Sequence, residues 1–401
     1  MSSSSLRPLF PVFFTVLIDL LGFGLVIPLM AYYAGDFDAT PVQITMLMAV
    51  YSFAQFLFAP VWGAISDNIG RRPVMLFSIA GATVCLAGFA SSTELWQLFL
   101  FRALHGAFAA NISTAQAYVA DLTTPENRSK GMGLIGASFG VGFTLGPWMG
   151  GELGKFGHSW PIWAAAILSA ANFVWALVGL PESRPKPGTH TGRTIDPRAM
   201  WQAIRHPNVG FAILLTFVSI FSFALMESTF SLVAERNWSM NIADVGRTFG
   251  AIGVIGIVIQ GGMIHRLTRM FGERSLIRAG LVANALGLLG LVSAVLGADA
   301  PWVAILRWSG CALLAVGSSL LNPSLNSLIS RGVSADEQGS VLGANQSLSA
   351  LARAGSTCSG GPIYQHLGAS SPFQIGAVLL FLALPLAIFG INSPRPRGGQ
   401  V

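Results

Sequence analysis

Two carboxyl groups lie inside long apolar stretches of this sequence, where a charge is costly. Asp19 is in the middle of the apolar run Leu9–Tyr33, and Glu227 lies toward the end of a later run. A charged side chain at the centre of a bilayer costs about 2.5–3.5 kcal/mol on insertion scales, so it persists when it is paired, faces water or can take up a proton. A carboxyl group that can neutralise itself therefore suits proton coupling. The simpler alternatives are that Asp19 only forms a hydrogen bond to another helix, and that Glu227 reaches interfacial water from a helix end.

Two arginines also interrupt apolar runs. Arg102 stands in the motif Leu98-x-x-x-Arg102-x-x-His105-Gly106, and Arg353 lies in a run near the end of the chain. A guanidinium group does not release its proton, so a buried arginine needs a carboxylate or carbonyl partner. Arg353 is a candidate for contacting an acid or an anionic solute in a cavity, and a fixed structural ion pair is the alternative for Arg102.

The elements that must position these groups are membrane-spanning helices. Apolar residues make up 53% of the 401-residue chain and charged residues only 10%, whereas a soluble domain carries roughly 25% charged residues. A helix needs roughly 20 apolar residues to cross a bilayer. Twelve runs meet this requirement: Leu9–Tyr33, Val42–Ile65, Pro73–Ser92, Leu95–Ala120, Gly131–Gly151, Trp160–Leu180, Val209–Val233, Val245–Ile264, Leu276–Leu296, Trp302–Ile329, Gln338–Gly361 and Pro372–Ile391. The sequence predicts an all-α integral membrane protein whose first run, too long for a signal peptide, is a retained span.

Several other classes of protein are disfavoured. The net charge of +6 and the pI near 9.6 come from basic residues that are not clustered as a nucleic-acid-binding face requires. Cys85, Cys311 and Cys358 lie inside apolar runs without ligand spacing, which supports neither a disulfide framework nor a zinc site. No nucleophile with its base and no phosphate-binding glycine loop is evident, so we expect neither an enzyme nor a cofactor.

The chain divides into two halves of six predicted spans each. Residues 1–180 and 208–401 are the predicted bundles, and the proline-rich, basic segment 181–207 is a predicted cytoplasmic linker. With the N-terminus inside, 17 of the 23 basic residues fall on cytoplasmic segments, which places both termini there. Arg102 and Arg307 lie early in spans four and ten. Such echoes predict two pseudo-symmetric bundles facing each other, with a solute site between them near the midplane.

A short polar turn, Gly63–Pro73, separates the second and third runs. Gly70 permits a tight reversal, and Arg71 and Arg72 hold the turn on the cytoplasmic side. Neither the reversal of the chain nor the placement of the turn at the cytoplasmic face explains Asp67. A carboxylate at a basic membrane face is expected to pair with an arginine or with the positive N-terminus of a neighbouring helix.

This turn resembles the signature loop between helices 2 and 3 of the major facilitator superfamily, closest to the tetracycline-efflux-like drug/proton antiporters. An ordinary positive-inside turn would not explain Asp67 together with Gly63 and Gly70, although Asn68 stands where the family usually has a basic residue. Asp121 and Arg128, after span four, resemble residues of the loop that joins this turn in a cytoplasmic latch. Ordinary helix-end and loop residues are the alternative.

Glycines recur at every fourth position of the fifth span. Gly142, Gly146 and Gly150 would line one ridge, followed by Gly151, and Pro147 would bend the helix. The pattern looks like the fifth-helix motif that marks antiporters within the superfamily. Gly246, Gly250 and Gly253 of span eight share nearly one face and are a predicted mate that would join the two halves.

Polar or aromatic residues inside spans are candidates for the substrate cavity. They are Tyr51, Gln55, Asn111, Gln116, Gln260, Asn322, Asn326 and Gln346. The alternative for each of them is a hydrogen bond between helices.

The resemblance, which covers nearly the whole chain, implies a proton-coupled exporter of a small amphipathic, drug-like compound that works by alternating access. It implies that Arg102 relays or gates proton movement and that Asp19, with Glu227, changes protonation. Spans three and nine lack the acidic residue that tetracycline pumps carry in each, which argues against tetracycline as the substrate. We expect a monomer in the bacterial cytoplasmic membrane, with protons and a small-molecule substrate as partners and no nucleic acid. The alternative function is a proton-coupled importer of an organic solute; a receptor or scaffold would need a sizeable soluble segment.

Overall fold

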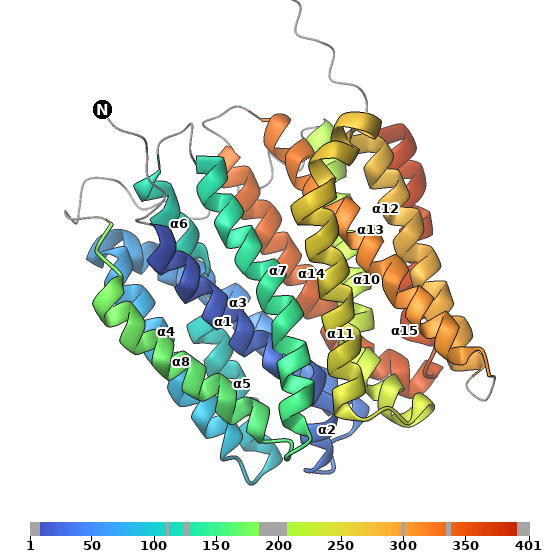
Figure 1. Ribbon diagram of the computed structural model, residues 1–401, viewed down its shortest axis with the longest axis horizontal. Coiled ribbons are helices and arrows are strands. Elements are labelled where there is room, and N and C mark those ends of the chain that lie inside the picture. Colours follow the sequence, from blue (N-terminus) through green and yellow to red (C-terminus); the bar gives the residue numbers. More distant parts are fainter. Residues whose placement is uncertain are drawn as a thin grey trace, which may run out of the picture.

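The computed structural model describes residues 9–109, 112–123, 128–183, 207–297, 301–333 and 338–390, and all the regular elements in these ranges are helical (Figure 1). The first half contains α1 (Phe10–Val26), η2 (Ile27–Leu29), α2 (Met30–Gly35), α3 (Pro41–Ile69), α4 (Arg71–Ala90), α5 (Leu95–Phe108), α6 (Ile112–Leu122), α7 (Arg128–Gly154) and α8 (Trp160–Gly179). The second half contains α10 (Pro207–Trp238), α11 (Ile242–Ile257), η4 (Val258–Met263), α12 (Ile264–Leu296), α13 (Val303–Arg331), α14 (Gln338–Leu367), α15 (Ser371–Pro385) and η5 (Leu386–Gly390).

Helix starts follow local sequence chemistry. Thr40 caps α3 through a reciprocal capping box with Gln43, and Pro41 occupies the first helical position, where its missing N–H costs nothing. Asn241 and Asp244 form the equivalent box at the start of α11. Polar turns of this kind separate long apolar helices and thereby set the alternation of the chain across the bundle.

The helices form two bundles that meet along two helix pairs. Within the first half α1 packs against α7 and α8, and within the second α12 packs against α13 and α15. Between the halves, the extensive contacts are those of α7 with α11 and of α3 with α14 (Figure 1). This arrangement agrees with the predicted fold of two bundles facing each other.

Eight helical stretches of the described residues are long and apolar enough to cross a membrane. One of them, Ile242–Leu296, contains two predicted spans in one continuous run with a non-helical kink at Gly272. The predicted spans in α7 and α14 are not among the eight because small and polar residues dilute their apolar character.

Span four differs from the prediction of one helix, Leu95–Ala120. Instead α5 ends at Phe108 and α6 begins at Ile112. Side chains of α3 bind carbonyl groups at the end of α5: Trp62 Nε1 donates to Ala107 at 2.6 Å and Gln55 Nε2 donates to Ala109 at 3.2 Å. These hydrogen bonds satisfy backbone carbonyl groups at the end of α5, where a helix has no further N–H groups to bond them.

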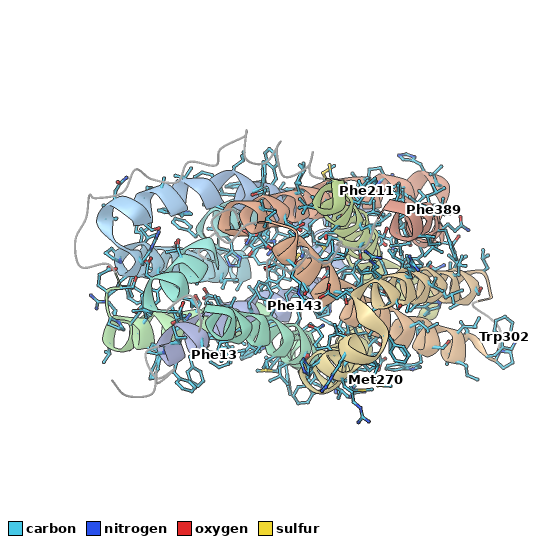
Figure 2. The ribbon with its side chains drawn as sticks, turned by 90° about the horizontal axis from the view of Figure 1, so that it is seen from above. Phe13, Phe143, Phe211, Met270, Trp302 and Phe389 are labelled. Atoms are coloured by element: carbon cyan, nitrogen blue, oxygen red, sulfur yellow. The ribbon has the colours of Figure 1, made fainter. Side chains whose placement is uncertain are left out.

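Large apolar side chains are abundant on the outer surface. Phe389 is 77% exposed and Val178 is 88% exposed, as suits side chains that face lipid. Seen from above, Phe13, Trp302 and Phe389 lie at the periphery, whereas Phe143 lies toward the middle between the halves (Figure 2). The apolar exterior and the polar groups described below are therefore separated.

The bundle has two ends, which we name by their turns. The hinge face carries the turn Ile69–Arg71 between α3 and α4, and the opposite face carries the turns that follow Ala90 and Gly154. Helices of each half alternate between these faces.

Candidate functional site

Asp19 of α1 is half-buried and is held by Asn172 of α8. The Asn172 side-chain amide donates to Asp19 Oδ1 at 3.0 Å and to the Thr15 carbonyl at 3.1 Å. Asn172 is fully buried, and within the described part of the chain neither its own Oδ1 nor the Thr15 hydroxyl has a hydrogen-bond partner. A carboxyl group at this position therefore sits beside polar atoms with unused hydrogen-bonding capacity.

Glu227 of α10 is the matching acid of the second half. It is 5% exposed, and its carboxylate lies 3.6 Å from Arg353 Nη1 of α14. The side chain of Arg353 is 34% exposed, so the pair is accessible from the arginine side. The two residues were separate candidates in the sequence, and the structure brings them together.

Arg102 of α5 is buried, at 3% exposure. No carboxylate of the described residues lies within 4.0 Å of its guanidinium nitrogens. Its Nε donates to the Leu47 carbonyl at 3.4 Å, and its guanidinium carbon lies 4.4 Å from the centre of the Tyr51 ring. Its Nη1 is buried without a hydrogen-bond partner. A backbone carbonyl and the face of an aromatic ring thus stabilise this charge.

Tyr51 of α3 connects these groups. Its ring contacts those of Phe23 and His105, each with a centroid separation of 5.2 Å. It lies within electrostatic range of Asp19 and Arg102 in its own half and of Arg353 in the other half. We call Asp19, Tyr51, Arg102, Glu227 and Arg353 the central cluster, because they come from five helices of both halves.

The remaining cavity candidates are scattered. Gln55 bonds the end of α5, and Gln260 is exposed in the π-helical turn η4 and bonds the Ser319 hydroxyl at 3.4 Å. Asn322, Asn326 and Gln346 are exposed, and Asn326 also accepts from Asn345 at 3.3 Å. Asn111 and the side chain of Gln116 lie outside the described residues. The structure therefore gathers the charged candidates more closely than the amides.

At the hinge turn, Gly70 adopts a φ of 103° and leads directly into α4. The backbone N–H groups of Arg71 and Arg72 donate to the two carboxylate oxygens of Glu182 at 3.0 and 3.1 Å. A Cβ on Gly70 would lie 2.6 Å from that carboxylate, so glycine is needed for space as well as for conformation. Glu182 thus binds the positive end of α4.

Sequence reasoning expected this helix-end role of Asp67 and treated Glu182 only as part of the linker. The side chains of Asp67 and Arg128 lie outside the described residues. A carboxylate just after a span, opposite a basic turn, was the available signal for Glu182.

The arginines of the turn also bind neighbouring helices. Arg71 Nε lies 3.2 Å from Asp121 Oδ2, and Arg71 Nη1 donates to the Ser66 hydroxyl at 2.5 Å. Arg72 Nη2 donates to the Leu177 carbonyl at 2.7 Å. These contacts connect α3, α4, α6 and α8 within one half, while a Cβ on Gly63 would meet no atom within 4 Å.

The glycine ridge of α7 packs against α1, which corrects the predicted pairing with α11. A Cβ on Gly146 would lie 2.7 Å from Gly24 Cα, and one on Gly142 would lie 2.6 Å from Leu20 Cβ. Gly150 packs against the Leu25 carbonyl. The periodicity showed correctly that these glycines share a face. The helix that packs against this face is α1 of the same half and not α11 of the other half.

A second face of α7 joins the halves. A Cβ on Gly246 of α11 would lie 2.5 Å from the Pro147 carbonyl and 2.7 Å from Gly151 Cα, and Gly253 packs against Thr144. The predicted glycines of span eight therefore do contact α7, but through Thr144, Pro147 and Gly151. Among the glycines of the motif, Gly151 is the one that packs against the other half.

Other contacts between the halves lie at the opposite face. Arg247 of α11 donates to Glu152 of α7 at 2.7 Å, and the Tyr32 hydroxyl donates to the Met240 carbonyl at 2.8 Å. Toward the hinge face, a Cβ added to Gly136 of α7 or to Gly261 of η4 would meet nothing within 4 Å. α7 and α11 contact each other at the opposite face and diverge toward the hinge face, as Figure 1 shows.

Two membrane-spanning helical bundles with ionisable groups buried inside each of them are the architecture of a secondary membrane transporter. The Major Facilitator Superfamily profile matches residues 12–357, and the chain belongs to this superfamily. The protein is thus a multi-pass integral membrane transporter and not an enzyme.

Individual relatives cover most of the chain. It is 33% identical over 346 residues to the tetracycline resistance protein, class C, of Escherichia coli, covering 84% of each chain. It is 31% identical over 376 residues to the major facilitator superfamily domain-containing protein 10 of Bos taurus, covering 88% of this chain and 79% of that one. The crystal structure of the human organic anion transporter MFSD10 (TETRAN) matches with a TM-score of 0.71 and 26% identity, over 95% of this chain and 99% of that chain.

Proposed function

We propose that this transporter exports a small amphipathic compound in exchange for protons by alternating access. The observation that carries the proposal is the central cluster, in which each half contributes one carboxyl group, held by a partner on another helix of its own half. The tetracycline resistance proteins among its relatives support export. Proton coupling needs acids that can bind and release a proton as the halves move.

Asp19 is the proposed proton carrier of the first half. As a carboxylate it accepts a hydrogen bond from Asn172, and as an acid its hydroxyl has two neighbouring acceptors without partners, Asn172 Oδ1 and the Thr15 hydroxyl. A protonated carboxyl group at this position would need an acceptor, and these two atoms are the candidates.

Glu227 is the proposed proton carrier of the second half, with Arg353 as the group that responds to it. While Glu227 is charged, the ion pair occupies Arg353. Protonation of Glu227 would weaken the pair and leave the partly exposed guanidinium free to bind an anionic part of the substrate. Arg102, which has no carboxylate partner among the residues that the structure describes, is a proposed gate for the proton beside Tyr51.

The aromatic groups of the site suit an amphipathic substrate. Phe23 contacts Tyr51 and also Phe143, whose ring centroid lies 5.7 Å away. Apolar walls beside a few charged groups are typical of small-molecule sites. Spans three and nine lack an acid, so tetracycline itself is not our proposed substrate.

The positive-inside rule supports an assignment of the two faces. The basic hinge turn and the basic segment 181–207 would face the cytoplasm, together with both termini. The structure, closed at the opposite face, would then be the cytoplasm-open state of a bacterial inner-membrane protein with bundles 1–180 and 208–401.

Transport in everted membrane vesicles tests this proposal. A panel of drugs and metabolites is supplied with and without an imposed proton gradient, and wild type is compared with Asp19→Asn. Export predicts proton-driven accumulation inside everted vesicles that the variant lacks. Accumulation in right-side-out vesicles under an inward proton gradient would instead favour the importer, and full coupled flux by Asp19→Asn would exclude Asp19 from the mechanism.

A further inference from the structure

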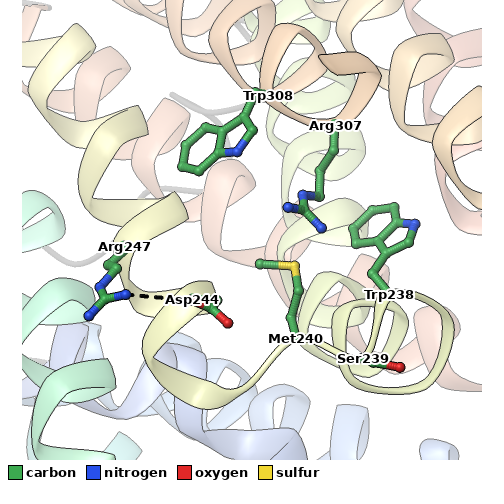
Figure 3. A pocket seen from close by; sticks show the side chains of 7 residues that line it. All are labelled: Trp238, Ser239, Met240, Asp244, Arg247, Arg307 and Trp308. Atoms are coloured by element: carbon green, nitrogen blue, oxygen red, sulfur yellow. Dashed lines mark ion pairs between the residues drawn. The ribbon is translucent and has the colours of Figure 1, made fainter. Parts of the chain in front are cut away.

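A cavity of about 420 Å³ lies at the opposite face of the second half, away from the central cluster. Trp238 and Met240 line it from the connection of α10 to α11, Asp244 and Arg247 from α11, and Arg307 and Trp308 from α13 (Figure 3). Its size is in the range of small-molecule sites. None of these residues belongs to the central cluster, although Arg247 and Met240 also take part in contacts between the halves at this face.

Arg307 is the uncompensated charge of this cavity. It extends from α13 into the space beside Trp238 and Met240 (Figure 3), and its buried Nε has no hydrogen-bond partner among the described residues. Among the described residues, its charge is met by the Trp238 ring, whose centre lies 5.6 Å from the guanidinium carbon, and no described carboxylate lies within 4.0 Å. A buried charged donor left without an acceptor is costly, so the site favours an anion.

The other two charges of the cavity compensate each other. Arg247 Nη1 lies 3.6 Å from Asp244 Oδ1, and Arg247 Nε donates to Glu152 of the other half at 2.7 Å. Asp244 also caps its own helix by receiving the Asn241 N–H. Arg247 is therefore engaged, and Arg307 remains as the group that can bind a ligand.

Trp238, Met240 and Trp308 form an apolar and aromatic part of the wall around Arg307. Trp308 is 43% exposed and Trp302, nearby in sequence, is 50% exposed. Tryptophans are enriched where a membrane protein meets the interface, at the depth of lipid headgroups. An occupant would place an oxyanion on Arg307 and an apolar body against Trp238, Met240 and Trp308.

We propose that this cavity is a binding site for an amphipathic oxyanion, a phosphate or carboxylate attached to an apolar body, recognised by Arg307. A phospholipid headgroup and a soluble organic anion share this chemistry. The site is separate from the central cluster, so it stands whether or not the proposed proton coupling is correct.

Binding is tested on the full chain in nanodiscs with two probes. Phosphatidylglycerol mixed into phosphatidylcholine nanodiscs is the lipid probe, with retained lipid counted by native mass spectrometry. Phenyl phosphate titrated into phosphatidylcholine nanodiscs is the soluble probe, followed by calorimetry. Arg307→Gln should weaken binding of the responding probe about tenfold, the loss of one charge-assisted hydrogen bond. Arg307→Lys, which keeps the charge, should retain most of the binding.

Arg236→Gln is the matched control, because this exposed arginine ends α10 at the same face but does not line the cavity. It should bind like wild type. If Arg307→Gln does not fold, Trp308→Ala keeps the charge and removes one wall, and should bind several-fold more weakly. A response to phosphatidylglycerol alone assigns the site to lipid, and a response to phenyl phosphate alone assigns it to a soluble anion. Binding of neither probe, or equal losses in Arg307→Gln and Arg236→Gln, would overturn the proposal.

Discussion

Arg353 and Glu227 form an ion pair at 3.6 Å that joins α14 to α10 inside the second half. Because α14 also packs against the first half, through α3, the pair lies on a helix that forms an interface between the halves. Its two members should therefore be coupled to each other and to the movement of the halves.

A double-mutant cycle measures this coupling. Glu227→Gln and Arg353→Gln should each reduce proton-driven transport strongly, while the double variant should lose less than the sum of the two effects. The expected interaction energy is about 0.5–3 kcal/mol, measured from transport rates and from unfolding in detergent. Gln365→Ala, on the same helix and exposed, is the control. Strictly additive losses would mean that the pair does not act as a unit.

Asn172 should matter because it orients Asp19. Asn172→Ala removes the donor to the carboxylate and should slow proton-coupled transport about tenfold, in line with the loss of one hydrogen bond to a charged group. Ser169→Ala is matched, since Ser169 lies on the same helix and bonds Thr83 instead. Initial transport rates in proteoliposomes provide the comparison. Equal rates for Asn172→Ala and wild type would remove this hydrogen bond from the mechanism.

Gly246 should tolerate no larger side chain. Leucine there would clash with the backbone at Pro147 and Gly151 and force α7 away from α11, so Gly246→Leu should make proteoliposomes leak protons or block transport. Gly261→Leu is the control, because its Cβ would meet no atom within 4 Å. Decay of an imposed proton gradient is the measurement. A tight, fully active Gly246→Leu protein would contradict the role assigned to this contact.

The Glu152 contact between the halves should respond to acid. Hydrogen bonds from Lys155 and Arg247 lower the pKa of Glu152 below its ordinary value of 4.5. A carboxyl group with a lowered pKa stabilises the contact at pH values above its ordinary pKa, and that stabilisation is lost as the pH falls through the lowered pKa.

Spin labels at the ends of α7 and α11 can report this change by pulsed electron paramagnetic resonance. The distance should lengthen in acid for wild type, while Glu152→Gln should be longer already at neutral pH and insensitive to acid. Lys155→Gln keeps the partner in the other half and should behave nearly like wild type. A wild-type distance that does not change with pH would argue against this contact.

Glu182 should stabilise the start of α4. Glu182→Gln removes the negative charge that accepts hydrogen bonds from the N-terminal N–H groups of Arg71 and Arg72. The substitution should lower the free energy of unfolding by about 1 kcal/mol. Glu235→Gln, an exposed glutamate at the opposite face, is the comparison. Unfolding in mixed detergent micelles would show the difference. Equal stabilities of the two variants would leave the Glu182 contacts without energetic weight.

The membrane helices and the chemical types of the central cluster could be predicted because they depend on local composition and on the cost of burying charge. Pairing could not. The glycine period shows that Gly146 shares a ridge with Gly142, but the choice of α1 over α11 depends on how α7 is rotated in the bundle. Glu182 acts on a helix that begins 111 residues earlier, a relationship that only the assembled half creates.

The backbone contact of Gly151 with Gly246 gives α7 a fulcrum near one end. Contacts of α7 with α11 reach as far as Gly140, and beyond it Ser138 and Ile135 pack against α1 of the same half. A tilt of about 10° at Gly151 would displace the Arg128 end of α7, about 35 Å away at 1.5 Å per residue, by about 6 Å, roughly two water molecules. A small rotation at glycine would thus decide whether solvent enters from the other end.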